Sequence, residues 1–206
     1  MKCPTCNQDM ELLFVNFHCW NCEKRKPVVT KETFEALSDK DKRISLANDV
    51  LRMLEAKKIQ AEYCTYLRPS DSMRRTDLGN PDSFSALKAS PSCHVCALGG
   101  LFLAGITHKP YEIDSNSVGF GKPIADYLST FFSPLQIWKI ETAFEADAIW
   151  QIPQMPEEDS DDWTTRHNRE VQASIKFALD YEDPTERLIA IMNNIVKYGE
   201  FIPENG

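Results

Sequence analysis

The feature that most constrains this chain is a set of four cysteines in its first 22 residues. They form two C-x2-C pairs, one ending at Cys6 and one starting at Cys19. Each pair is expected to form a tight turn with two thiolates on one side, and two facing turns give the tetrahedral thiolate shell that zinc prefers, with Zn–S bonds of about 2.3 Å. The sequence therefore predicts a zinc ribbon whose metal ligands are Cys3, Cys6, Cys19 and Cys22. A closed shell of four thiolates indicates a structural zinc, because a catalytic zinc keeps an open position.

The stretch between the two pairs, from Glu11 to Phe17, is apolar enough to supply strands that carry the second pair opposite the first. Zinc should contribute most of the folding free energy of this lobe, since so short a segment has little core of its own. His18 lies next to Cys19. The regular spacing of Cys19 and Cys22 nevertheless favours four thiolates over three thiolates and one imidazole.

Aromatic and basic residues around the ribbon leave two interpretations open. Trp20 could stack on nucleic-acid bases while Lys24, Arg25 and Lys26 contact phosphate. Alternatively, Trp20 and the nearby phenylalanines form the small core of the ribbon itself, which is the interpretation we favour.

Length and charge limit the remaining possibilities. A chain of 206 residues, 42% of them hydrophobic, favours one main domain with a small appendage. We expect a zinc ribbon at residues 1–30 and a globular domain at residues 31–206. The net charge of -8 argues against coating nucleic acid as the main role, because non-specific binding to phosphates needs a basic face.

The start of the sequence and its cysteine content predict a cytoplasmic protein. Met1 leads directly into Lys2 and Cys3, with no apolar stretch of the kind that signal peptides contain. The longest apolar run, residues 95–106, is too short to span a bilayer, so no membrane association is expected. Paired cysteines without a secretory signal are typical of a reducing compartment, where they bind metal more often than they form disulfides.

Hydrophobic spacing predicts that residues 31–206 are mainly helical with a minor β element. One strand is expected at residues 59–67, where side chains alternate, and loops are expected at 68–81 and 107–122. Helices are expected at residues 38–58, 84–88, 93–106, 123–132, from 134 onward, 169–180 and 184–198.

Capping residues define several helix ends. Ser38, Ser133 and Asp183 are suitable N-caps, and Gly199 is a suitable C-terminal stop. Gln136 follows Ser133 at the spacing of a capping box.

Residues 93–106 are apolar on nearly all sides, which predicts a central buried helix with Ser92 as its N-cap. Its residues Leu98, Leu101 and Phe102 are expected to be almost fully buried.

The second cysteine pair, Cys93 and Cys96, has three competing interpretations. A C-x-x-C at a helix N-terminus is found in redox-active pairs. A second zinc site would recruit Cys64 and either His94 or His108. The third and preferred interpretation is packing, because the small residues that follow let a neighbouring helix approach closely. A nucleophile pair of Cys93 and His108 is a further candidate, but the spacing reveals no complete nucleophile–base–orienter set.

The motif C-x-V-C-A-L-G-x-L-F, from Cys93 to Phe102, resembles one in an uncharacterised group of phage and bacterial proteins. The segments 43–51, 132–134 and 187–195 are also similar to that group, so the resemblance extends over most of residues 40–203. It implies a phage or mobile-element origin, with the ribbon as a variable addition, and carries no known activity.

These observations favour a non-enzymatic zinc-containing protein that binds another protein. The resemblance makes a host enzyme or a defence component a natural target. The first alternative is an accessory protein that binds nucleic acid through the ribbon and a basic loop containing Arg68, Arg74 and Arg75. The second is a Cys/His enzyme centred on Cys93. The sequence leaves the oligomeric state open.

Overall fold

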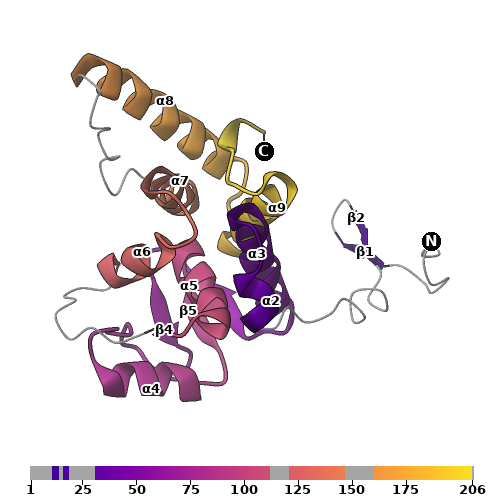
Figure 1. Ribbon diagram of the computed structural model, residues 1–206, viewed down its shortest axis with the longest axis vertical. Coiled ribbons are helices and arrows are strands. Elements are labelled where there is room, and N and C mark those ends of the chain that lie inside the picture. The colour runs from indigo at the N-terminus through magenta and orange to yellow at the C-terminus, as the bar shows by residue number, and fades with distance from the viewer. Residues whose placement is uncertain (1–10, 14–15, 19–30, 112–120, 147–159, 206) are drawn as a thin grey trace.

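A computed structural model describes residues 11–13, 16–18, 31–111, 121–146 and 160–205 of the protein. The described part is mainly helical and contains two small sheets (Figure 1). This confirms the predicted class of a mainly helical protein with a minor β element. The predicted boundary between ribbon and main domain, at residue 30, lies outside the described residues.

The helices, in chain order, are α2 (Lys31–Glu35), α3 (Asp39–Glu55), α4 (Pro81–Ala89), α5 (Ala97–His108), α6 (Lys122–Leu128), α7 (Pro134–Glu145), α8 (Ser160–Leu179), α9 (Pro184–Tyr198) and the 3-10 turn η1 (Pro203–Asn205). The strands are β1 (Glu11–Leu13), β2 (Asn16–His18), β3 (Ile59–Ala61), β4 (Leu67–Pro69) and β5 (Cys93–Val95).

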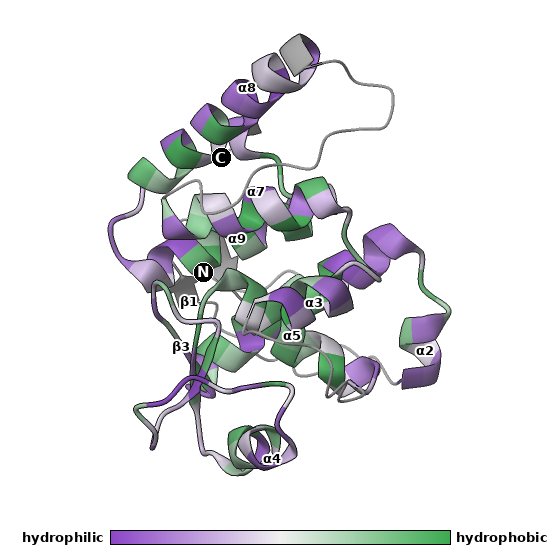
Figure 2. Cartoon of the chain, turned by 90° about the vertical axis from the view of Figure 1, so that its left-hand side faces the viewer, coloured by the Kyte–Doolittle hydropathy of each residue, from purple (hydrophilic) through white to green (hydrophobic). Residues whose placement is uncertain are grey.

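Helix α5 is the centre of the hydrophobic core, as its composition predicted. Leu101 and Phe102 are fully buried and Leu98 is 1% exposed. Helices α3, α6 and α7 pack around α5, and Figure 2 shows it as a largely hydrophobic helix. A helix with no polar face is stable only when it is surrounded in this way.

The glycines of α5 allow close approach, by a helix at Gly100 as the sequence predicted, and by a strand connection at Gly99, which was not predicted. A Cβ atom on Gly99 would lie 1.7 Å from the carbonyl oxygen of Tyr66, in the connection between β3 and β4. Position 99 therefore accepts only glycine unless that connection moves. Gly100 faces Val50 on α3, where an added Cβ would lie 3.4 Å from the nearest methyl carbon.

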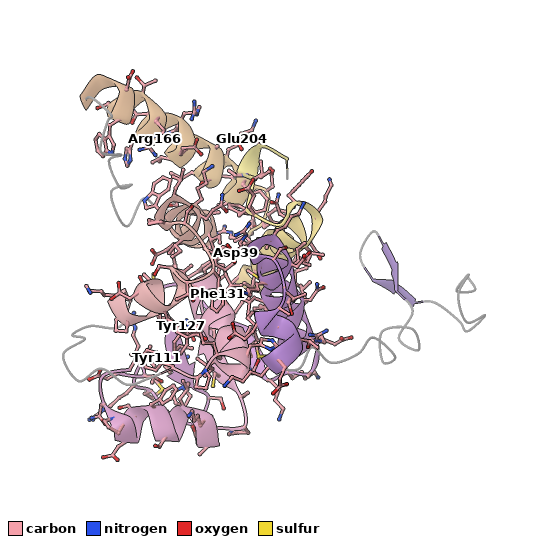
Figure 3. All side chains as sticks on the ribbon, viewed as in Figure 1. Asp39, Tyr111, Tyr127, Phe131, Arg166 and Glu204 are labelled. Carbon is pink, nitrogen blue, oxygen red and sulfur yellow. The ribbon has the colours of Figure 1, made fainter. Side chains whose placement is uncertain are left out.

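An aromatic cluster connects α5 and α6 with Tyr111, which follows α5, and Phe131, which follows α6. The ring of Tyr127 lies 5.1 Å from that of Phe102, 6.1 Å from that of Tyr111 and 5.7 Å from that of Phe131, each in an edge-to-face arrangement. Figure 3 labels Tyr111, Tyr127 and Phe131, which lie near one another. Edge-to-face pairs of this kind add about 0.5–1.5 kcal/mol beyond the area that they bury.

The three-stranded sheet corrects two predictions from the sequence. Its strand order is β3-β5-β4, with β5 parallel to β3 and antiparallel to β4. The predicted helix at 93–106 therefore begins with a strand, and its N-cap is Cys96 instead of Ser92. The single strand predicted at 59–67 is two short strands, separated by a turn in which Cys64 has a φ of 56°. Both differences arise because β5 pairs with segments that are distant in sequence.

Most predicted helix caps are present. The side chain of Ser38 accepts a hydrogen bond at the start of α3, Ser133 does so at the start of α7 and Asp183 at the start of α9. Gly199 ends α9 with a φ of 81°, in the left-handed region that favours glycine.

Gln136 does not complete the predicted capping box. Its side-chain amide instead bonds to the backbone of Phe201, beyond α9. Local spacing predicted that the Gln136 side chain would cap its own helix. In the structure it instead fixes the C-terminal segment against α7.

Helix α8 is longer than predicted. It begins at Ser160 instead of residue 169, and its first turn contains two aspartates. Acidic residues stabilise the first turn of a helix, because the N-terminal end of the dipole is positive. Helix α8 packs on α7, and α4 lies at the opposite end of the molecule in both views (Figures 1 and 2).

Strands β1 and β2 form an antiparallel pair with Glu11 opposite His18 and Leu13 opposite Asn16. Strands were predicted here, between the two cysteine pairs. Within the part of the chain that the structure describes, no helix combines the length and apolar character needed to cross a bilayer.

Candidate functional site

The predicted zinc ligands Cys3, Cys6, Cys19 and Cys22 lie outside the described residues. The same holds for Trp20 and for Lys24, Arg25 and Lys26, which were predicted as nucleic-acid contacts. The zinc ribbon therefore stays a prediction.

The other predicted site residues occupy separate positions in the fold. Cys93 lies on β5, Cys96 caps α5, exposed Cys64 lies in the turn between β3 and β4, and His108 is the last residue of α5. Among residues 31–111, 121–146 and 160–205, no group of three or more histidine, cysteine or acidic side chains is arranged to hold a metal ion. The structure thus does not assemble the candidate second zinc site from Cys64, Cys93, Cys96 and His108.

Cys93 and Cys96 have the environment of packing residues. Their exposed fractions are 6% and 2%. Burial raises the pKa of both thiols, and for Cys93 the nearby Asp71 carboxylate raises it further. The thiolate is the reactive form of cysteine. These two thiols are therefore poorly suited to redox chemistry or nucleophilic attack, although Cys96 does accept a hydrogen bond from the Gly99 amide at 3.5 Å.

His108 cannot act on Cys93 in this arrangement. His108 is the last residue of α5, whose twelve residues span about 17 Å at the usual helical rise, and Cys93 precedes the first residue of that helix. The imidazole of His108 instead bonds to Asp49 at 2.7 Å and stacks on Phe34, with 4.2 Å between ring centroids. This buried arrangement joins α2, α3 and α5, which is a structural role.

His94 belongs to a polar group on the three-stranded sheet. Its Nδ1 lies 2.9 Å from the carboxylate of Glu62, which also accepts a hydrogen bond from Arg68 at 2.5 Å. Another nitrogen of Arg68 donates to the carbonyl of Ser72 at 3.1 Å. Arg68, which the sequence offered as a phosphate ligand, is therefore engaged inside the domain.

The segment from Ser70 to Thr76, here called the Met73 loop, is held at both ends. The Ser70 amide donates to the Ser92 carbonyl at 2.9 Å, and the Thr76 amide donates to the Leu67 carbonyl at 2.8 Å. Inside the loop, the Ser72 hydroxyl accepts the amide of Arg74 at 3.1 Å. These bonds fix the backbone of a segment that projects from the end of the sheet.

The loop presents an apolar side chain between polar ones. Met73 is 93% exposed, and Arg74 and Arg75 beside it are both exposed. Sequence reasoning identified the two arginines but overlooked Met73. The sequence feature that could have indicated it is a lone methionine within a polar loop, followed by two arginines.

A cavity of about 460 Å³ is the other prominent feature. It lies where α6 and α7 meet the β3–β4 connection and the start of α5, and most of its lining is apolar. Its walls include Tyr66, Leu98, Ala125, Ile137, Trp138 and Glu141. Cavities of about 300–1,000 Å³ accommodate small molecules in proteins.

Glu141 places a carboxylate in the wall of this cavity although only 6% of the residue is exposed. Its carboxylate accepts a hydrogen bond from the Tyr66 hydroxyl. One turn along α7, Glu145 accepts the amide of Cys64 at 2.7 Å. Burial raises the pKa of Glu145, and repulsion from Glu141 adds to this, whereas the Cys64 amide and the charge of Arg187 lower it.

No local pattern in the sequence predicts this cavity. Its lining comes from segments near positions 66, 98, 121–129 and 134–141. Glu141 follows the apolar residue Ile140. From the sequence alone it would be predicted to lie at the polar edge of an amphipathic helix. Its contact with Tyr66, which is 75 positions away, becomes visible in the structure.

No known protein family, curated protein or solved structure matches this chain.

Proposed function

We propose that the protein is a non-enzymatic, zinc-containing binding protein that recognises another protein, and that the Met73 loop belongs to the recognition surface. The observation that carries the proposal is a 93% exposed methionine, beside two exposed arginines, on a loop fixed at both ends. Methionine and arginine are both enriched in protein–protein interfaces.

The hydrogen bonds of the loop support this role energetically. A binding segment that is already ordered loses less conformational entropy on association than a flexible one. The bonds of Ser70, Ser72 and Thr76 give the loop that order before any partner arrives. Met73 itself keeps a flexible, polarisable side chain that adapts to an irregular apolar pocket.

The chemistry of the loop defines the partner. Arg74 and Arg75 favour carboxylates, which guanidinium groups bind in a bidentate manner. Met73 requires an apolar depression beside those carboxylates. The loop is a local basic element on a chain of net charge -8, so it gives an acidic partner a favourable place to approach.

The predicted zinc ribbon supplies a second element for the same role. Its closed thiolate shell serves structure and leaves the surrounding side chains available for contact. A phage or mobile-element origin, which the resemblance of residues 93–102 suggests, would make a bacterial enzyme or defence component the natural target.

A capture experiment tests the proposal. The intact protein, Met73→Asp and Leu179→Asp are used in parallel as baits in bacterial lysate. Leu179 is the matched control, because it is a 71% exposed apolar residue at the end of a different element, α8. We expect one protein to be retained by the wild type and by Leu179→Asp but not by Met73→Asp. Equal retention by all three baits would contradict a role for the loop.

Nucleic-acid binding is the second candidate function, and the exposure of Arg74 and Arg75 is the observation that favours it. Together with the basic residues 24–26 they offer about five charges, which would give weak binding that falls steeply as salt rises. Fluorescence polarisation with a labelled single-stranded and a labelled duplex DNA at physiological salt distinguishes the functions. Submicromolar binding that Arg74→Ala abolishes and Met73→Ala leaves intact would favour nucleic acid over protein.

A further inference from the structure

The cavity beside α7 lies at the boundary between two hydrophobic clusters. Leu98 and Ile137 belong to the main core around α5. Trp138, the next residue of α7, belongs to a smaller cluster that it forms with Val171 of α8. All of these except Val171 line the cavity. Protein interiors leave few voids larger than a water molecule, so a space of about 460 Å³ at this boundary is large enough to hold a ligand.

The walls of the cavity are buried and apolar, whereas its rim is exposed and polar. Leu98 is 1% exposed, Trp138 4% and Ile137 7%. Lys122 and Asp126, which also line the cavity, are exposed residues of α6. The cavity is therefore a recess that opens to solvent along α6 and ends against the packed core. Because core side chains form its walls, its shape is set before any ligand binds.

Gly121 fixes the position of another wall. A Cβ atom at position 121 would lie 2.6 Å from both Cζ and the hydroxyl oxygen of Tyr66. A glycine here therefore lets the Tyr66 ring lie directly against the backbone at the start of α6, where the ring lines the cavity. This contact places an aromatic ring on the side formed by the β3–β4 connection.

The polar side chains of the lining bond to groups of the protein itself. The Tyr66 hydroxyl donates to the carboxylate of Glu141. At the rim, the ammonium group of Lys122 donates to the carboxylate of Asp126 at 2.8 Å, and the Ser129 hydroxyl donates to the Asp126 carbonyl at 2.6 Å. The lining therefore does not require a ligand to supply a charge or a hydrogen bond. A charged ligand would lose its own hydration in this apolar recess, which is unfavourable.

The volume of the cavity indicates the size of the ligand. Apolar cavities of about 150 Å³ in proteins bind benzene. The present cavity is about three times as large, which is enough for about two fused rings with room for a small substituent. The rings of Tyr66 and Trp138 in its lining favour an aromatic ligand, because aromatic rings pack well edge to face or offset against one another.

We propose that this cavity binds an uncharged, apolar small molecule of about two fused rings, in contact with Leu98, Ile137 and Trp138. This binding function goes beyond the proposed recognition of another protein. The cavity shares no residue with the Met73 loop, so the two proposals are tested separately.

The test uses three probes that share a naphthalene body: 2-naphthalenemethanol, which is neutral, 2-naphthylmethylamine, which is a cation, and 2-naphthoate, which is an anion. The indole N–H signal of Trp138, assigned with Trp138→Phe, is followed by NMR in the full chain. We expect a saturable shift with the neutral probe and binding at least about tenfold weaker with both charged probes. Equal or tighter binding of either charged probe, or no binding of the neutral probe at about 1 mM, would overturn the proposal.

Intermolecular NOEs locate the bound probe. We expect NOEs between the naphthalene protons of 2-naphthalenemethanol and the methyl groups of Leu98 and Ile137, which line the cavity. NOEs that involve only residues outside the cavity would contradict the proposal. This measurement uses the wild-type protein and so does not depend on the folding of any variant.

Substitutions of Ala125 test the same site by filling it. Ala125 is a half-buried residue of the lining, so Ala125→Leu should weaken binding of the neutral probe at least about tenfold. Ala125→Met fills the space with a more adaptable side chain and replaces Ala125→Leu if that variant does not fold. Ala86→Leu, at an exposed position of α4, is the matched control and should bind as the wild type does. Wild-type affinity in a folded Ala125 variant would show that the probe binds elsewhere and that the proposal is wrong.

Discussion

The side-chain amide of Gln136 holds the backbone of Phe201 through two hydrogen bonds. The amide N–H of Phe201 donates to Oε1 at 2.8 Å, and Nε2 donates to the Phe201 carbonyl at 3.2 Å. The Phe201 ring is fully buried, 5.0 Å from that of Phe177 on α8. One side chain at the start of α7 thus fixes the chain terminus beneath α8.

Replacing Gln136 by alanine should therefore destabilise the protein by about 1–3 kcal/mol, because it leaves two partly buried backbone groups without their partner. Urea unfolding followed by circular dichroism gives the change. Ser133→Ala, which removes only the N-cap of the same helix, is the comparison and should cost about 1 kcal/mol. A loss below about 0.5 kcal/mol for Gln136→Ala would show that the terminus is held by packing alone.

The two glycines of α5 offer a matched pair of substitutions. Gly99→Ala should destabilise the protein by about 1–3 kcal/mol, because its Cβ would lie 1.7 Å from the Tyr66 carbonyl oxygen and force the β3–β4 connection to move. Gly100→Ala meets only methyl groups from 3.4 Å outward, and alanine in a helix interior gains about 1 kcal/mol over glycine. Thermal unfolding of both variants tests this order, and equal effects would contradict the close approach at Gly99.

Local signals explain which parts of this fold the sequence could predict. Ser38, Ser133, Asp183 and Gly199 act on their own helix ends. Their residue types alone therefore indicated where α3, α7 and α9 start and where α9 ends. The burial of α5 followed in the same way from a helix without a polar face.

Non-local contacts explain what sequence reasoning missed. Strand β5 exists because β3 and β4 lie on either side of it, and a short apolar run does not by itself distinguish strand from helix. The cavity required Tyr66 and Glu141 to meet across 75 positions. The sequence does not show that Met73 is exposed on an ordered loop, because that order depends on the hydrogen bonds of Ser70 and Thr76.

Cysteine labelling separates the packing role of the second cysteine pair from a redox role. Cys64 is exposed, whereas Cys93 and Cys96 are buried with raised thiol pKa values. Iodoacetamide should therefore modify Cys64 in the folded protein while Cys93 and Cys96 stay unmodified until denaturant is added. Peptide mass spectrometry provides the measurement. Modification of Cys93 at a rate similar to that of Cys64 would revive the redox and nucleophile hypotheses.

The raised pKa of Glu145 predicts a defined dependence of stability on pH. The folded state binds this proton more tightly than the unfolded chain does, so the stability from this group is present below the ordinary carboxyl pKa and is lost as pH rises through the raised value. Glu145→Gln keeps an acceptor for the Cys64 amide and removes the titration. Its stability relative to the wild type should therefore increase between about pH 4 and about pH 7.

Urea unfolding at several pH values measures this difference. Glu204→Gln, at an exposed position in η1, is the control and should follow the wild type throughout. If stability changes with pH in the same way for the wild type and Glu145→Gln, the pKa of Glu145 is not raised. The effect of burial on that pKa would then be cancelled by the Cys64 amide and the charge of Arg187.

Metal content tests the predicted ribbon. Protein purified without chelator should carry about one zinc per chain, and Cys6→Ser should release it because three thiolates no longer close the tetrahedral shell. The helical signal should remain, since the described helices lie between residues 31 and 205 and the cysteine pairs precede them. Cys64→Ser, outside the predicted shell, is the matched control and should keep its zinc. Protein without zinc would contradict the ribbon. A content of about two zinc ions per chain, falling to about one in Cys64→Ser, would instead support the second zinc site at Cys64, Cys93 and Cys96.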